Sequence, residues 1–120
     1  MHYILDTHIL IWWLYDDKRL SAKYKNIIEN PKNFIYISIA SLWEIEIKRN
    51  LNKIEIYEKY IDIIKELDFN ILNINIEHIK YLSKLANIHK DPFDRILISQ
   101  AIVEDFILLT NDKKIEAYFK

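Results

Sequence analysis

Apolar residues follow two different spacings along this chain, and the two spacings alternate. Short runs of consecutive or alternating apolar residues are typical of strands, while apolar residues recurring every three or four positions are typical of helices that bury one face. The pattern predicts strands at residues 3–5, 34–37, 71–76 and 106–109. It predicts helices from residue 7 onward, at 21–29, 38–50, 57–67 and 79–85, from residue 92 onward, and at 113–119.

Strands that alternate with helices, and that are apolar on both faces, predict an α/β domain. Its parallel β-sheet should be flanked by helices on both faces, in three layers. The 120 residues contain no internal repeat and no Pro/Ser-rich linker, so a single domain over residues 1–120 is expected. In such sheets ligands bind beyond the carboxyl ends of the strands, and functional side chains are expected at that edge.

The composition excludes several kinds of site. The chain has no cysteine and no glycine, which excludes disulfides, thiolate metal sites and glycine-rich phosphate loops. With 17 basic and 18 acidic residues it has no general positive field, so binding of nucleic acid would need local basic patches. No apolar run reaches the roughly 18 residues of a membrane span, and the first residues do not resemble a signal peptide. A cytoplasmic protein without a membrane segment is expected.

The histidines, two tryptophans and one basic run are explained by structural roles better than by metal or RNA binding. The four histidines show no HExxH-like spacing, so each is expected to be a surface or core residue. Trp12 and Trp13 are expected in the core or in contacts with a protein partner, and not as platforms for stacked bases. Lys48, Arg49 and Lys53 form a basic run that fits a solvated helix face better than a path for RNA.

Four carboxylates are predicted to share the carboxyl edge of the sheet. Asp6 directly follows the first strand, Glu44 lies just inside the helix after the second, Asp94 begins a later helix, and Asp112 follows the last strand. Like charges gathered at one edge repel each other and raise each other's pKa unless a cation lies among them. Oxygen ligands without thiolates suit Mg²⁺ or Mn²⁺, which commonly serve in the hydrolysis of phosphate esters.

Capping of helices is the alternative explanation for these acids. Ser41 and Glu44 fit the SxxE capping box, and Asp112 fits the N-cap of the last helix. Asp91 before Pro92 fits an N-cap followed by the first helical position, which places Asp94 in the first helical turn.

Four segments together resemble a known family. They are "YILDTHILIWWL" at 3–14, "SIASLWEIEIK" at 38–48, "HKDPFDRILISQA" at 89–101 and "LLTNDKKI" at 108–115. The chain resembles the PIN-domain family, and within it the VapC-type ribonuclease toxins of type II toxin–antitoxin systems. The resemblance implies a three-layer α/β/α fold and a Mg²⁺- or Mn²⁺-dependent endoribonuclease that hydrolyses RNA phosphodiester bonds with a metal-activated water. It also implies a cognate antitoxin and a homodimer.

The resemblance also implies roles for individual residues. Asp6, Glu44, Asp94 and Asp112 would be the catalytic metal ligands. Supporting roles would fall to Thr110, which is similar to the residue that orients the last acid, and to the hydroxyls of Thr7 and Ser38, with Asp91 as the helix cap. Independently of the resemblance, Arg95 next to Asp94 is expected either to bind a phosphate or to form a structural ion pair.

Three other functions are weaker interpretations. A phospho-acceptor receiver domain needs an acidic pair after the first strand and a lysine after the last, and "DTH" and "LLTND" supply neither. A haloacid-type phosphatase needs a second acid at position 8, which is histidine. The third is a PIN-like module without catalysis that serves only in protein interactions.

Overall fold

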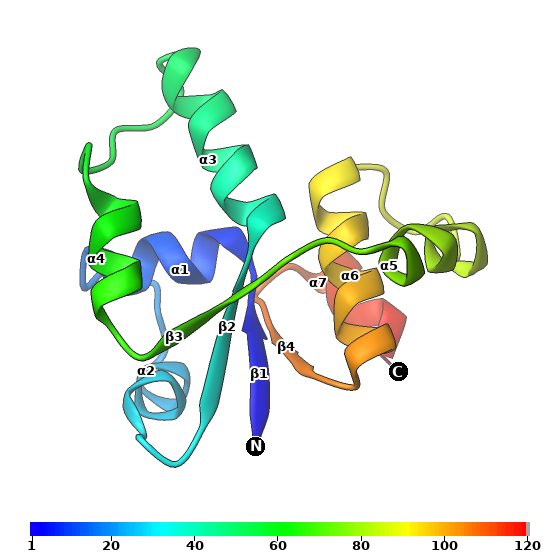
Figure 1. Ribbon diagram of the computed structural model, residues 1–120, viewed down its shortest axis with the longest axis horizontal. Helices are drawn as coiled ribbons and strands as arrows, with labels where there is room; N and C mark the ends of the chain where they lie inside the picture. The colour runs from blue at the N-terminus through cyan, green and yellow to red at the C-terminus, as the bar shows by residue number, and fades with distance from the viewer. Residues whose placement is uncertain (120) are drawn as a thin grey trace.

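The computed structural model describes residues 1–119 and consists of a parallel sheet between two layers of helices (Figure 1). The sheet has four strands in the order β3-β2-β1-β4, and every neighbouring pair is parallel. The strands are β1 (His2–Leu5), β2 (Phe34–Ser38), β3 (Phe69–Leu72) and β4 (Ile107–Leu109). The α/β class and the parallel sheet expected from the sequence are thereby confirmed.

The helices connect the strands and cover both faces of the sheet. In Figure 1, α1, α2 and α4 lie to one side of the sheet, and α5, α6 and α7 lie to the other. Their bounds are α1 (Thr7–Leu14), α2 (Ala22–Glu29), α3 (Ile39–Asn50), α4 (Tyr60–Glu66), α5 (Ile76–Tyr81), α6 (Pro92–Glu104) and α7 (Lys113–Glu116), with short 3₁₀ turns at Leu82–Lys84 and Ala117–Phe119. Among residues 1–119, no helix combines the length and the apolar character needed to cross a membrane.

Side chains of the central strands β1 and β2 alternate between two hydrophobic cores. In β1, Tyr3 and Leu5 join the core beneath α1, α2 and α4, while Ile4 joins the core beneath α6 and α7. This alternation is the two-residue period of a strand, and burial on both faces explains why the strands are continuously apolar. The first core centres on Ile9, Leu10, Ile28, Ile45 and Ile64, and the second on Leu97, Ile98, Ala101 and Ile115.

The predicted strand at 71–76 is wrong in its bounds. β3 pairs with β2 from Phe69 to Leu72, and the pairing stops there because β2 itself ends at Ser38, the N-cap of α3. Asn75 then caps α5: its side chain accepts from the backbone N–H of His78, and Nδ1 of His78 accepts from the backbone N–H of Asn75. The closing helix is also shorter than predicted, since α7 ends at Glu116 and continues as a 3₁₀ turn.

Aspartate and asparagine occupy the left-handed backbone positions of this glycine-free chain. Asp16, Asn52 and Asp105 have φ angles of 49°, 55° and 59°. These residue types tolerate positive φ best after glycine because their short polar side chains can form local hydrogen bonds. Asp105 ends α6 in this conformation, as glycine commonly does at helix ends.

Candidate metal centre at the carboxyl edge of the sheet

Asp6 and Thr110 are held side by side at the ends of neighbouring strands. The backbone N–H of Asp6 donates to the carbonyl of Leu109 at 3.0 Å, which extends the pairing of β1 with β4 by one residue. The Thr110 hydroxyl, Oγ1, then donates to Oδ2 of Asp6 at 2.8 Å. Burial raises the pKa of Asp6 above its usual range, although the Thr110 hydrogen bond opposes that shift. Glu44 adds to the rise through charge repulsion, so the two carboxylates lie close enough to interact.

Asp112 caps α7 and is connected to Asp6 through Thr110. Its backbone N–H donates to the Thr110 hydroxyl at 3.0 Å. The Thr110 side chain therefore contacts both Asp6 and Asp112. Oδ1 of Asp112 accepts from the backbone N–H groups of Lys114 and Ile115, which confirms the predicted N-cap. Burial tends to raise its pKa, but these amides and His89 outweigh that effect and hold the pKa below the usual value.

Glu44 is buried in α3 and does not form the predicted capping box. α3 begins at Ile39, and the N-cap is Ser38, whose hydroxyl accepts from the backbone N–H of Ala40 at 3.0 Å. Ser41 therefore lies within the helix. Oε2 of Glu44 accepts from Nζ of Lys48 at 2.7 Å, whereas Oε1 is buried without a hydrogen-bond partner among residues 1–119. An unpartnered carboxylate oxygen is costly to bury, and a cation at this position would offset that cost.

Asp94 lies in the first turn of α6, as predicted from the Asp-Pro step. Asp91 is the N-cap, and its Oδ1 accepts from the backbone N–H groups of Phe93 and Asp94 at 2.9 and 3.1 Å, with Pro92 as the first helical residue. Burial raises the pKa of Asp94 to about 7, and repulsion from Asp6, Asp91 and Glu44 contributes to the rise. Carboxylates from three separate segments of the chain thus raise the pKa of Asp94.

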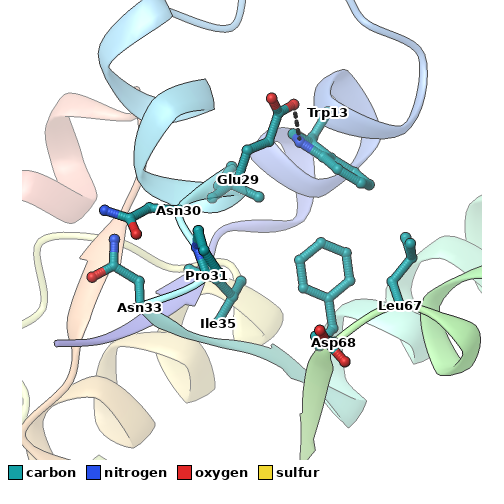
Figure 2. Close-up of a pocket in the computed structure, with 10 residues that line it drawn as sticks. Trp13, Glu29, Asn30, Pro31, Asn33, Ile35, Leu67 and Asp68 are labelled. Atoms are coloured by element: carbon teal, nitrogen blue, oxygen red, sulfur yellow. Dashed lines mark hydrogen bonds between the residues drawn. The ribbon is translucent and has the colours of Figure 1, made fainter.

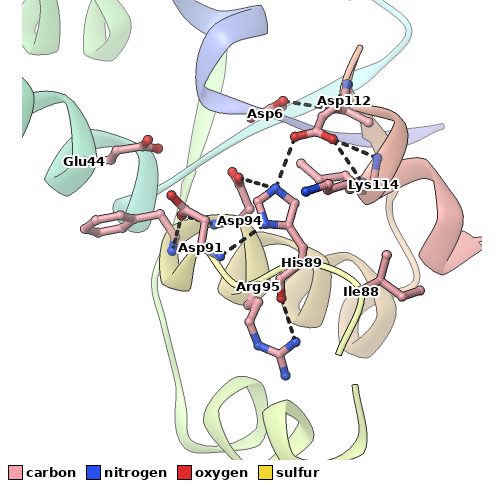
Figure 3. Close-up of polar contacts among 12 residues, drawn as sticks. Asp6, Glu44, Ile88, His89, Asp91, Asp94, Arg95, Asp112 and Lys114 are labelled. Carbon is pink, nitrogen blue, oxygen red and sulfur yellow. Dashed lines mark hydrogen bonds and ion pairs between the residues drawn. The ribbon is translucent and has the colours of Figure 1, made fainter. Parts of the chain in front are cut away.

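His89 belongs to this cluster, although it was expected to be an ordinary surface or core residue (Figure 3). Its Nε2 lies 2.9 Å from Oδ2 of Asp94 and 3.1 Å from Oδ2 of Asp112. Its Nδ1 accepts from the backbone N–H of Asp91 at 3.1 Å. Since Nδ1 is an acceptor, the ring proton lies on Nε2 and is shared between the two carboxylates. The imidazole therefore separates two acids that would otherwise repel each other.

The ligand atoms of His89, Asp94 and Asp112 all lie within 4.8 Å of one another, close enough to contact one ion. Asp6 and Glu44 border the same group (Figure 3). The carboxylate oxygens of this group, with no sulfur beside them, suit Mg²⁺ or Mn²⁺, while the Nε2 of His89 carries a proton in this arrangement. The unpartnered oxygen of Glu44 and the raised pKa of Asp94 fit a set of acids that is incompletely compensated without a cation.

The predicted supporting residues differ in what they contact. Thr110 contacts the acids directly, but Thr7 donates to Oγ of Ser41 at 2.9 Å and Ser38 donates to Oε1 of Gln100 at 2.6 Å. These two buried hydroxyls join α1 to α3 and α3 to α6, so they hold the helices and not the carboxylates. Their supporting role at the site stays a prediction, and it would act through the placement of these helices.

Arg95 forms no ion pair with an acid of the site within residues 1–119. Its guanidinium donates to the carbonyls of Leu82, Ala86 and His89, and to the hydroxyl of Tyr118. In Figure 3 it extends away from the acids. Arg95 therefore fixes the loop that carries His89 and Asp91 in place beneath the site.

A second pocket lies at the opposite, amino-terminal edge of the sheet (Figure 2). It encloses about 180 Å³ between the start of β2, the start of β3 and the end of α2. Trp13 borders it, donating from Nε1 to Oε2 of Glu29 at 3.2 Å and packing edge-on against Phe69. The pocket has no group of acids close enough to share an ion, so the carboxyl edge remains the candidate site.

Comparisons with known proteins match the chain over almost its whole length. The family model described as PIN domain matches residues 3–119. Among solved structures, VapBC2 from Rickettsia felis, bound to a DNA fragment from their promoter, matches with a TM-score of 0.73 and 23% identity, over 98% of this chain and 93% of that one. VapBC-1 from nontypeable Haemophilus influenzae matches with a TM-score of 0.69 and 21% identity, over 99% of this chain and 92% of that one. No curated protein matches the chain significantly.

Proposed function

The chain belongs to the PIN-domain family, and from this membership we propose that it is a metal-dependent endoribonuclease, the toxin of a type II toxin–antitoxin pair. Asp6, Glu44, Asp94 and Asp112 are the proposed ligands of Mg²⁺ or Mn²⁺ and the proposed catalytic residues. The observation that carries this function is the buried Oε1 of Glu44, which has no partner among residues 1–119, while the charge of Glu44 raises the pKa of both Asp6 and Asp94.

The cation, when bound, would neutralise charge on the scissile phosphate and activate the water that attacks it. Neighbouring side chains would hold the proposed ligands ready for the cation. Thr110 fixes the rotamer of Asp6 and the backbone of Asp112 together. Asp94, with a pKa of about 7, holds a proton for part of the time near neutral pH and must release it to become a ligand. Lys48 holds one oxygen of Glu44 and leaves the other free.

RNA is the proposed substrate, although the acids alone would repel it. The chain carries a net charge of -1, so local cations have to draw the phosphates in. Lys48 beside Glu44 and Lys114 beside Asp112 lie at the border of the site (Figure 3 for Lys114). A cytoplasmic location is proposed with this substrate, since cellular RNA is found there.

An antitoxin protein is the proposed partner of the chain. Support comes from the two similar structures, VapBC2 and VapBC-1, each of which has the same fold over more than nine-tenths of its chain. Expression of the chain in bacteria should arrest growth, and co-expression of a short reading frame encoded beside its gene should relieve the arrest. Arrest by Asp6→Asn as strong as by wild type would contradict the nuclease as its cause and would favour the non-catalytic interaction module.

A homodimer is proposed through an apolar groove of about 380 Å³ next to the site. Trp43 and Phe93 meet edge-on there, with ring centroids 5.2 Å apart, and Trp43 is 58% exposed. An exposed aromatic pair of this kind is typical of a surface buried in an assembly. The groove is lined by Trp43, Ile74, Ile79, Leu82, Pro92, Phe93 and Ile96. Analytical ultracentrifugation should give a dimer for wild type and a monomer for Trp43→Asp, and a monomeric wild type would contradict this interface.

A further inference from the structure

A separate pocket opens directly beside the acid cluster, on the side of α1. It encloses about 310 Å³, near the lower limit for pockets that bind small ligands and enough for one planar group. Two of its residues are acids of the cluster, so a ligand in the pocket would touch the candidate metal centre. The pocket is lined by Asp6, His8, Trp12, Arg19, Asn111 and Asp112.

Trp12 and Arg19 give this pocket a planar wall. The guanidinium carbon of Arg19 lies 5.0 Å from the centroid of the Trp12 ring, a distance typical of cation–π contacts. Asp17 fixes the guanidinium in that position, accepting from Nε at 3.1 Å and from Nη2 at 2.8 Å. The Arg19 side chain is nevertheless 68% exposed, so one side of this wall is open to a ligand.

His8 and Asn111 supply hydrogen-bonding groups next to that wall. The His8 ring lies 6.1 Å from the Trp12 ring at a tilt of 45°. Both side chains are exposed. An amide and an imidazole can each donate and accept, which are the interactions that read the edge of a base.

From these contacts we propose that the pocket binds one unpaired nucleotide of the RNA, adjacent to the phosphate that is cut. The base stacks on the Trp12–Arg19 wall, and His8 and Asn111 contact its edge. Stacking on aromatic and guanidinium planes is how proteins hold bases of single strands, and a base within a duplex cannot enter such a pocket. The inference rests on the proposed function, because the acids of the cluster would lie at the neighbouring phosphate.

Trp13 provides a matched control on the same helix. It is the next residue along α1, yet it borders the pocket at the opposite edge of the sheet and is bonded to Glu29 (Figure 2). Trp12 and Trp13 were expected alike to lie in the core or in contacts with a protein partner and not to stack on bases, yet they face different surroundings, and for Trp12 the proposal departs from that expectation. A substitution of either should cost a comparable amount of packing, since both pack against the same core as partly buried residues.

Binding without metal tests the pocket independently of catalysis. Fluorescence anisotropy in EDTA would compare a labelled single-stranded RNA octamer with the same octamer carrying one abasic position. Trp12→Leu should weaken binding of the intact octamer about ten-fold, as expected for one lost base stack, and Trp13→Leu should bind like wild type. Equal affinities of Trp12→Leu and wild type would overturn the proposal. Asn111→Ala, an exposed change, takes the place of Trp12→Leu if circular dichroism shows that the latter is unfolded, and equal affinity would again overturn it.

Cleavage of a randomised single-stranded RNA pool with Mg²⁺ supplies the second readout. Wild type and Trp13→Leu should cut with a preference for one base at a fixed position next to the cut, and Trp12→Leu or Asn111→Ala should lose that preference. An unchanged preference would overturn the nucleotide pocket while leaving the nuclease intact. If wild type cuts no RNA at all, the proposed function fails, and the comparison in EDTA still decides the pocket.

Discussion

Nε2 of His89 lies 2.9 Å from Oδ2 of Asp94, in the first turn of α6, and the same nitrogen reaches Asp112 at 3.1 Å. The loop before α6 thus places a hydrogen-bond donor between two acids from different parts of the chain. An Nε2 that carries the proton cannot bind a metal, because its lone pair is used by that proton. For a cation to contact both acids, the ring has to move aside or transfer its proton to Nδ1.

Replacing His89 tests whether its imidazole is only a hydrogen-bond donor between the two acids or is itself a metal ligand. In His89→Asn, the side-chain oxygen can still accept from the backbone N–H of Asp91, while the Nε2 donor is lost. We expect the metal-free protein to melt at a lower temperature, because Asp94 and Asp112 then repel each other. Calorimetry should show Mn²⁺ binding at least as tight as in wild type. A loss of Mn²⁺ affinity of ten-fold or more would instead identify His89 as a ligand.

The pH dependence of stability follows from Asp94. Its pKa rises from 3.8 to about 7 on folding, so the folded protein binds its proton more tightly than the unfolded chain does. The contribution of Asp94 to the stability of the metal-free protein is therefore largest below pH 4 and decreases as the pH rises toward 7. We expect the melting temperature in EDTA to decrease by on the order of 5 °C between pH 5 and 8. Asp94→Asn should show a much smaller decrease.

The affinity for metal should have the opposite pH dependence and increase as the pH rises. A ligand that must lose a proton binds metal more weakly at low pH, by about ten-fold per pH unit below its pKa. Isothermal titration calorimetry should therefore show tighter Mn²⁺ binding at pH 8 than at pH 6, with proton release at the lower pH. The same affinity at both pH values would contradict the role of Asp94 as a protonated ligand.

Thr110 is expected to matter for both stability and metal binding. Thr110→Val keeps the shape of the side chain but leaves Oδ2 of Asp6 and the backbone N–H of Asp112 without their partner. We expect the free energy of unfolding in urea to fall by about 1–3 kcal/mol and Mn²⁺ to bind more weakly. Ser99→Ala removes another buried hydroxyl, bonded to the carbonyl of His78, and should lower stability without changing Mn²⁺ binding.

Lys48 is the counter-charge of Glu44, and its removal should have opposite effects on stability and on metal affinity. In Lys48→Met both oxygens of a buried carboxylate lack a partner, so the metal-free protein should lose on the order of 1–3 kcal/mol of its free energy of unfolding. Mn²⁺ should bind several-fold more tightly, because a positive charge has been removed from the site. Lys53→Met, an exposed change in the same basic run, should alter neither quantity, and equal behaviour of the two variants would contradict the role of Lys48.

Much of the fold can be predicted from the sequence, because the central strands β1 and β2 are buried on both faces and are therefore rich in consecutive apolar residues. β1 and β2 appear as such runs and are found where they were expected. The strand at 71–76 was misplaced because its alternation of isoleucine and asparagine continues past the point where the neighbouring strand ends. Pairing with a partner strand sets the end of β3, and this partner cannot be seen in the local pattern.

The site could be predicted only in part, for a related reason. The positions of Asp6 and Asp112 at strand ends and of Asp94 in a first turn follow from local signals, and their role as metal ligands stays a prediction. His89 was missed because its contact with Asp112 joins residues 23 positions apart and depends on how the loop before α6 folds. Ser41 and Glu44 matched a capping motif, but the helix had already begun at Ile39 after a better-placed cap, Ser38.

Cleavage of single-stranded RNA by the purified chain is the most direct test of the proposed nuclease. Wild type and Asp94→Asn should be incubated with labelled RNA and with Mg²⁺, Mn²⁺ or EDTA. We predict cleavage by wild type with either metal, none in EDTA, and at least a hundred-fold slower cleavage by Asp94→Asn, about 2.7 kcal/mol in activation free energy. Cleavage that persists in EDTA, or that proceeds equally in Asp94→Asn, would contradict the metal centre, and no cleavage by wild type would contradict the nuclease.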